Sequence, residues 1–259
     1  EFADWRVAKR EGWRSFGGDE PLMGQHWYHP EGPDYVTGDR IDPARPSNLM
    51  YSDIAGERRL VALSYNVRIA PGEPMPEGFA GSQDRWHVHD MTAALHAATE
   101  TRPVLGWLER GWLERDGASD GRTRLAMVHL WLIPNPMGRF AAHNPALAYL
   151  DLGLPADWAR GVDLDTARGV ALATPEGCEE ALGGKLWVAA VPGETRRALD
   201  NACAQLADYV RKGLEEDRAR LNARGKAAWA RLEDELDARL TPAQTARIAA
   251  MTEHGHGGH

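Results

Sequence analysis

Histidines are the residues whose spacing most clearly suggests chemistry in this chain. His87 and His89 stand two positions apart in the stretch WHVHD. Residues i and i+2 of a β-strand point to the same face, so a strand here would present both imidazoles together. A third imidazole from another segment would complete a nitrogen site suited to zinc or copper. We expect His129, in the apolar run LAMVHLWLI, to be the third ligand, with His26 as the next candidate.

The same pattern is compatible with two other roles. A histidine in a strand is often a core residue that hydrogen-bonds to the backbone, and it can also act as a general acid or base. A three-histidine site is the arrangement seen in carbonic anhydrases, where a metal-bound hydroxide attacks a small substrate. An HxH pair also opens the metal motif of cupins. That motif needs a glutamate a few residues later, and here the chain continues as DMTAA, which disfavours a cupin.

Residues near these histidines refine the hypothesis. Asp84 and Asp90 flank the pair and could orient the imidazoles as hydrogen-bond acceptors, or lie at solvated strand ends. Nitrogen-rich ligation with tryptophan and methionine nearby, including Met23 and Met127, favours copper. The chain contains no GxSxG, HExxH, P-loop or dinucleotide-binding motif. Ser64 has no recognisable base partner, so a nucleophilic hydrolase is disfavoured.

A second group of histidines closes the chain. His254, His256 and His259 form the sequence HGHGGH, which is native or an appended tag. A glycine-rich tail of this kind binds divalent metals weakly in any flexible chain. We therefore treat residues 252–259 as a flexible tail and not as part of a folded site.

Composition excludes several classes of protein. The chain has 259 residues, 43% hydrophobic and 26% charged, which is typical of a globular protein. The net charge of −8 and the lack of a basic stripe exclude nucleic acid as an expected partner. No window approaches the roughly 18 apolar residues of a membrane span. The first residue is Glu1, so the chain has been trimmed or has lost an export signal. Cys178 and Cys203 could form one disulfide or remain buried thiols.

Apolar patterning predicts a β-sheet in the first part of the chain. Residues 59–69 alternate most clearly, with Val61, Leu63 and Tyr65 on one face. Residues 1–45 look irregular, and the repeat GWLERGWLER at 106–115 fits a hairpin or a helix. Further strands are expected at residues 47–52, 85–90, 125–133 and 186–191, a helix at 91–99, and short helices or turns near 144–150 and 175–182.

The last part of the chain has helical periodicity. Leu199, Leu206 and Val210 lie on one apolar stripe, and Trp229 and Leu232 begin another. The step TPAQ at 241–244 has the form of a capping box with proline at the first helical position. We expect an α+β fold: a mixed or antiparallel sheet domain at 1–192, then an amphipathic helical region at 193–251. Its stripes would pack on the sheet domain or on a second copy in a homodimer.

Several motifs resemble a family of uncharacterised, exported bacterial proteins. The family pattern has an early H-[WY]-x-N-P, which here reads HWYHP from His26. A later H-x-W-x-x-x-N-P-x-G-x-F-A-x-x-N-P reads HLWLIPNPMGRFAAHNP from His129. The resemblance covers about residues 20–150. His29 replaces an asparagine of the pattern, and Ser64 replaces a glutamate. The resemblance implies export and a shared fold, but no reaction.

The sequence therefore predicts a periplasmic or secreted protein that binds copper or zinc through His87, His89, His129 and His26. The alternatives are a metal-dependent enzyme that acts through a metal-bound water at an open three-histidine site, and a metal-free structural or partner-binding module.

Overall fold

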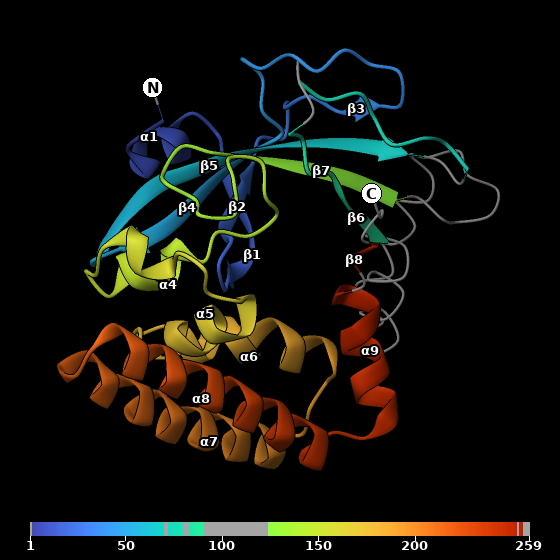
Figure 1. The fold of residues 1–259 in the computed structure, drawn as a ribbon. Helices are drawn as coiled ribbons and strands as arrows, with labels where there is room; N and C mark the ends of the chain where they lie inside the picture. Colours follow the sequence, from blue (N-terminus) through green and yellow to red (C-terminus); the bar gives the residue numbers. More distant parts are fainter. Residues whose placement is uncertain (1, 70–71, 80–82, 91–123, 253, 256–259) are drawn as a thin grey trace.

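The chain folds into two layers, a β-sheet and a group of helices that lies along one face of it (Figure 1). The structure, a computed structural model, describes residues 2–69, 72–79, 83–90, 124–252 and 254–255. Strands dominate the N-terminal part and helices the C-terminal part. The expected α+β class is therefore confirmed.

The sheet has eight strands in the order β1-β2-β4-β5-β7-β6-β8, and these neighbours pair antiparallel. The short strand β3 adds to β5 in parallel. Strand bounds are β1 Arg14–Glu20, β2 Gly24–Tyr28, β3 Tyr35–Val36, β4 Asn48–Ile54, β5 Glu57–Ile69, β6 His87–Asp90, β7 Arg124–Trp131 and β8 His254–Gly255. The strands expected at residues 47–52, 59–69, 85–90 and 125–133 are β4, β5, β6 and β7.

The two faces of the sheet differ in polarity. On the face away from the helices, Tyr65, Val67 and Val128 pack with Ile41 and Val88 into an apolar cluster. The opposite face carries the alternate residues of the same strands. Because side chains alternate along a strand, His129 in β7 lies on this second face, which is the one turned towards the helical layer.

The helices begin well before residue 193. Their bounds are α1 Trp5–Arg10, α4 Ala146–Asp151, the 3₁₀ helix η2 Ala156–Ala159, α5 Leu164–Ala171, α6 Gly177–Val188, α7 Gly193–Arg211, the 3₁₀ helix η3 Lys212–Glu215, α8 Arg218–Arg239 and α9 Pro242–Thr252. One apolar core joins α4 to α8, so the predicted boundary at 192/193 divides a single packed unit. The stripes of α7 and α8 are buried inside the chain's own helical layer.

Two glycines allow α5 and α8 to cross at very short range. A Cβ atom on Gly169 of α5 would meet the backbone of Gly225 in α8, and a Cβ on Gly225 would lie 2.9 Å from the carbonyl oxygen of Thr166. Neither position has room for a side chain. Cys178 of α6 and Cys203 of α7 are joined by a disulfide, which ties two further helices of this layer together.

Two sequence expectations about secondary structure were wrong. Residues 1–45 are not irregular, since they contain α1, β1, β2 and β3. A Gly-rich stretch does not by itself predict a strand. Here β1 is a strand because its backbone hydrogen-bonds to β2. Residues 186–191 are not a strand. They continue and end α6, because a short apolar run looks the same in a buried helix and a buried strand.

The end of α8 and the start of α9 follow the sequence closely. Gln244 donates its backbone N–H to the Thr241 hydroxyl at 3.3 Å, and its side-chain oxygen accepts the Thr241 backbone N–H at 2.9 Å. This is the predicted capping box. Beyond it, residue 252 still belongs to α9 and residues 254–255 form β8, so this part of the expected flexible tail is ordered against β6.

Other expectations are not tested by the described part of the chain. The helix at 91–99 and the repeat at 106–115 lie outside the described residues. Among the helices that the structure describes, none combines the length and the apolar character of a membrane span.

Candidate metal centre

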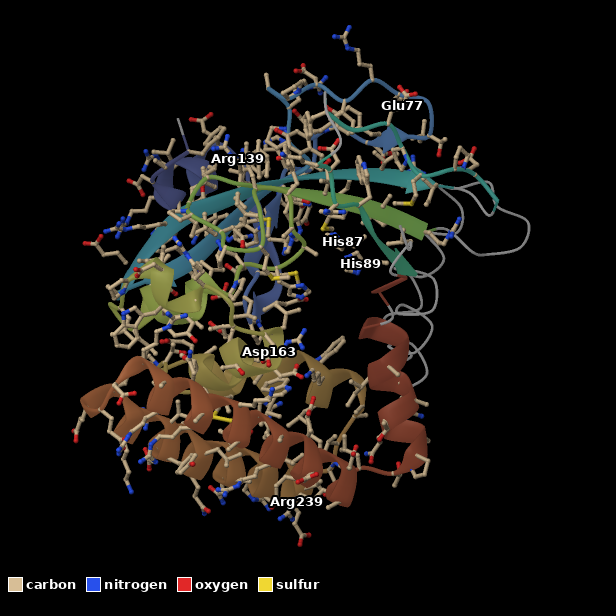
Figure 2. All side chains as sticks on the ribbon, viewed as in Figure 1. Glu77, His87, His89, Arg139, Asp163 and Arg239 are labelled. Carbon is tan, nitrogen blue, oxygen red and sulfur yellow. A yellow bond between two sulfur atoms is a disulfide. The ribbon has the colours of Figure 1, made fainter. Side chains whose placement is uncertain are left out.

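Strands β6 and β7 place three of the expected ligands, His87, His89 and His129, next to Met127. Met127 and His129 are two residues apart on β7 and therefore share a face. The antiparallel register sets His87 of β6 opposite Met127, and His89 opposite Leu125. Figure 2 shows His87 and His89 on the side of the sheet that faces the helical layer. The expected strand geometry of the His-x-His pair is thus present.

His26 reaches this group from the other half of the sheet. Strands β4 and β5 separate β2 from β7, a backbone distance of about 14 Å at the usual strand spacing. On this face β5 places the short side chains of Ala62 and Ser64 opposite Trp131 and His129. The imidazoles of His26 and His129 approach each other over these two short side chains. The Nε2 atom of His26 lies 3.4 Å from the Nε2 atom of His129.

The four expected ligands form a continuous row of rings. The ring centroids of His89 and His87 are 5.0 Å apart, and those of His87 and His129 are 4.8 Å apart. The row ends at His26, whose ring centroid lies 5.5 Å from that of His129. His129 is fully buried and His87 nearly so, whereas His26 and His89 keep some exposed surface. The sheet therefore brings together all four residues singled out by the sequence.

A backbone carbonyl fixes the orientation of His129. Its Nδ1 atom lies 2.8 Å from the carbonyl oxygen of Ala142. That oxygen can only accept, so Nδ1 carries the proton and donates it. In the neutral ring Nε2 then holds a lone pair, and this lone pair faces His26. Metal-binding histidines in proteins are usually oriented by such a hydrogen bond from the other ring nitrogen.

Burial keeps the central imidazoles uncharged. Desolvation lowers the pKa of His26 to about 4. The pKa of His129 is also lowered well below its ordinary value, first by desolvation and then by the neighbouring His87 and His26. Neutral imidazole is the form that binds a metal, so no proton has to be displaced near neutral pH.

Within the described residues, the donor spacing suits two imidazole ligands of one ion. Among the described residues, no three histidine, cysteine, aspartate or glutamate side chains are arranged so that they could hold one ion. The expected three-histidine site therefore stays a prediction. The pair formed by His26 and His129 does have the spacing of two ligands of one ion. Two imidazole nitrogens at about 2.0 Å from a tetrahedral ion lie about 3.3 Å apart, close to the separation of the two Nε2 atoms.

The flanking carboxylate that can be placed does not orient an imidazole. The Oδ2 atom of Asp84 accepts the backbone N–H of Phe79 at 2.6 Å and so organises the loop before β6. Among the described contacts, Asp84 does not accept a hydrogen bond from an imidazole of His87 or His89. In the tail, His254 pairs by its backbone with His89, while His256 and His259 lie outside the described residues.

A group of carboxylates between the sheet and α6 was not anticipated from the sequence. Arg58 pairs with Asp53 and Asp19 at 2.7 and 2.9 Å. Desolvation raises the pKa of Asp19 and of Asp151 to about 6, and that of Glu180 to about 8. These residues come from five separate elements, β1, β4, β5, α4 and α6, and no local motif connects them. We refer to Asp19, Asp53, Arg58, Asp151, Glu176 and Glu180 as the acidic cluster.

Comparison of the chain with protein-family models, with curated proteins and with solved structures gave no match. The resemblance to exported bacterial proteins therefore stays a prediction, and the chemistry of the histidine row has to be argued from its own geometry.

Proposed function

We propose that this is an exported protein that binds copper or zinc through its histidine row, with His26 and His129 at the centre. The observation that carries the proposal is the approach of their two Nε2 atoms to 3.4 Å. This is long for a hydrogen bond between neutral rings and close to the separation of two ligands on one ion.

The surroundings of the pair support ligand binding. His129 is completely buried and held by Ala142, so one ligand is preorganised. His87 lies against His129 and can join the ion with a small side-chain movement, since the ring centroids are 4.8 Å apart. Export is supported by the disulfide between Cys178 and Cys203, because such bonds persist mainly in oxidising compartments.

The test is a metal titration of the folded, full-length chain. The substitutions His254→Ala, His256→Ala and His259→Ala first remove weak binding by the tail. In this background we expect one zinc or copper ion per chain with submicromolar affinity. His26→Ala and His129→Ala should each weaken binding by at least about tenfold, because each removes a central ligand.

His29 provides the matched control. It lies three residues from His26, yet its Nε2 faces the carbonyl oxygen of Glu11 at 2.9 Å, and its Nδ1 accepts the backbone N–H of Glu31. His29→Ala should leave the affinity unchanged. Absence of binding in the tail-substituted chain, or equal loss in His29→Ala and His129→Ala, would remove the proposal.

A further inference from the structure

Met127 is a sulfur donor that faces the central pair. Its Sδ atom lies 3.1 Å from the Nε2 atom of His129, and both side chains are buried. Met127 also stands opposite His87 in the strand register, so it neighbours histidines of both β6 and β7. The thioether is therefore part of the same cluster of donor atoms.

The protons around His129 make this contact informative. The Nδ1 proton of His129 is directed at Ala142, so in the neutral ring Nε2 presents a lone pair to the sulfur. Sulfur also presents lone pairs, and two acceptors at this distance gain nothing from each other. An electrophile bound to Nε2 of His129 and to Sδ would satisfy both atoms, and Nε2 of His26 lies 3.4 Å from the same Nε2 atom.

On this basis we infer that the site takes copper in its monovalent form, with Met127 as a ligand beside His26 and His129. The inference rests on the proposed function and specifies its metal. Soft thioether ligands favour Cu(I), whereas zinc is usually held by imidazole, thiolate and carboxylate. One thioether and two imidazoles also fit the finding that no three histidine, cysteine or acidic side chains in the described residues form a site.

The neighbouring oxygen atoms do not compete for this role. Ser64 stands opposite His129, but its hydroxyl donates to the side-chain oxygen of Asn66 at 2.7 Å. Asn66 stands opposite Met127, and its backbone N–H donates to the Ser47 hydroxyl. The hydroxyl of Ser64 and the side-chain oxygen of Asn66 are thus hydrogen-bonded to each other, whereas the nitrogen of His129 and the sulfur of Met127 face one another.

The experiment compares Cu(I) and Zn(II) affinities in the tail-substituted, full-length chain and in its Met127→Leu variant. Bicinchoninate competes for Cu(I) in the absence of oxygen, with ascorbate as a reductant that leaves the disulfide intact. A chromophoric chelator competes for Zn(II). Leucine keeps the volume of methionine but lacks the sulfur. We expect Met127→Leu to weaken Cu(I) binding by at least about tenfold and to change Zn(II) binding by less than about threefold.

The matched control is Met137→Leu, which changes an exposed methionine in the loop after β7. It should leave both affinities unchanged. X-ray absorption of the Cu(I)-loaded parent chain adds a readout that needs no variant. We expect a sulfur neighbour at about 2.3 Å. Both cysteines are in the disulfide, so this sulfur would come from a thioether.

Two negative results of these experiments distinguish the thioether ligand from the proposed function. If the parent chain binds zinc or copper but shows no sulfur neighbour, and Met127→Leu keeps its Cu(I) affinity, the thioether ligand is overturned and the proposed function stands. If the parent chain binds neither metal, both proposals are overturned together.

Discussion

At the scale of single residues, the fold gathers two sets of titratable side chains, the histidine row and the acidic cluster. His87 and His89 share a face because of strand periodicity alone, which a sequence displays directly. The approach of His26 to His129 depends on pairing across four strands, β2, β4, β5 and β7. Asp19 and Glu180 belong to elements far apart in the chain, so nothing local indicates that they share an environment.

The acidic cluster predicts a stability that depends on pH through Glu180. Its folded-state pKa of about 8 lies above the ordinary 4.5, because burial and the carboxylates of Asp19 and Asp151 disfavour its charge. A raised pKa means that the folded state holds the proton more tightly. The stabilisation is therefore complete below about pH 4.5 and is lost as the pH rises through about 8.

Glu180→Gln removes this titration and keeps the shape of the side chain. We expect it to stabilise the protein by at least about 1 kcal/mol near pH 8.5 and to have little effect near pH 5. One pKa unit corresponds to about 1.4 kcal/mol, and partial exposure reduces the total. Urea unfolding at both pH values measures it.

Glu179→Gln is the control for this prediction. Glu179 is the preceding residue on α6, and its side chain is 73% exposed in a surface ion pair with Arg196. Such pairs contribute little, so its substitution should shift stability by a small amount that is similar at both pH values. A constant difference between Glu180→Gln and the parent chain at the two pH values would contradict the prediction.

At the scale of elements, the close crossing of α5 and α8 is the most demanding contact. A Cβ added to Gly225 would overlap sterically with α5: Val170 Cγ2 would lie 2.8 Å away and the carbonyl oxygen of Thr166 2.9 Å away. Real Cβ atoms do not approach backbone this closely, so the helices would have to separate.

Gly225→Ala should therefore destabilise the protein by about 3 kcal/mol, although alanine is the better helix former by about 1 kcal/mol. Gly184→Ala is the matched control, because Gly184 is an exposed residue of α6 with no atom within 4 Å of an added Cβ. It should be neutral or stabilising. Thermal unfolding of both variants tests the pair, and equal effects would show that the crossing does not require glycine.

The same scale shows how far the sequence could predict the fold. Long alternating strands such as β5 and a capped helix such as α9 were identified because one local pattern defines each of them. Strand β1 was missed because its Gly17 and Gly18 carry no strand signal, and its pairing with β2 is what makes it a strand. The role of Gly225 was also hidden, since a glycine in an amphipathic stretch looks like a break until its partner Gly169 is known.

At the scale of the whole molecule, the helical layer has its own core and its own cross-link. The largest apolar cluster joins α4 to α8 and includes Cys203, whereas the histidine row belongs to the sheet. The disulfide between Cys178 and Cys203 closes a loop with a sequence separation of 25 residues. In the chain-entropy description, a loop of this size stabilises the folded state by about 3 kcal/mol.

Replacing both cysteines by alanine should lower the free energy of unfolding by about 3 kcal/mol and leave metal affinity unchanged, because the cross-link lies in the helical layer. Guanidinium unfolding measures the first effect and the metal titration the second. A reductant should destabilise the parent chain by a similar amount and leave the double variant unaffected. Equal stability of the oxidised parent and the double variant would contradict this prediction.

The separation of the two central histidines along the chain sets a condition on the proposed metal centre. His26 and His129 are 103 residues apart, and the sheet between them has to assemble before their rings can meet. Under the proposed function, an unfolded chain would have no centre to load. The ion would then be taken up after folding, from the compartment in which the chain folds.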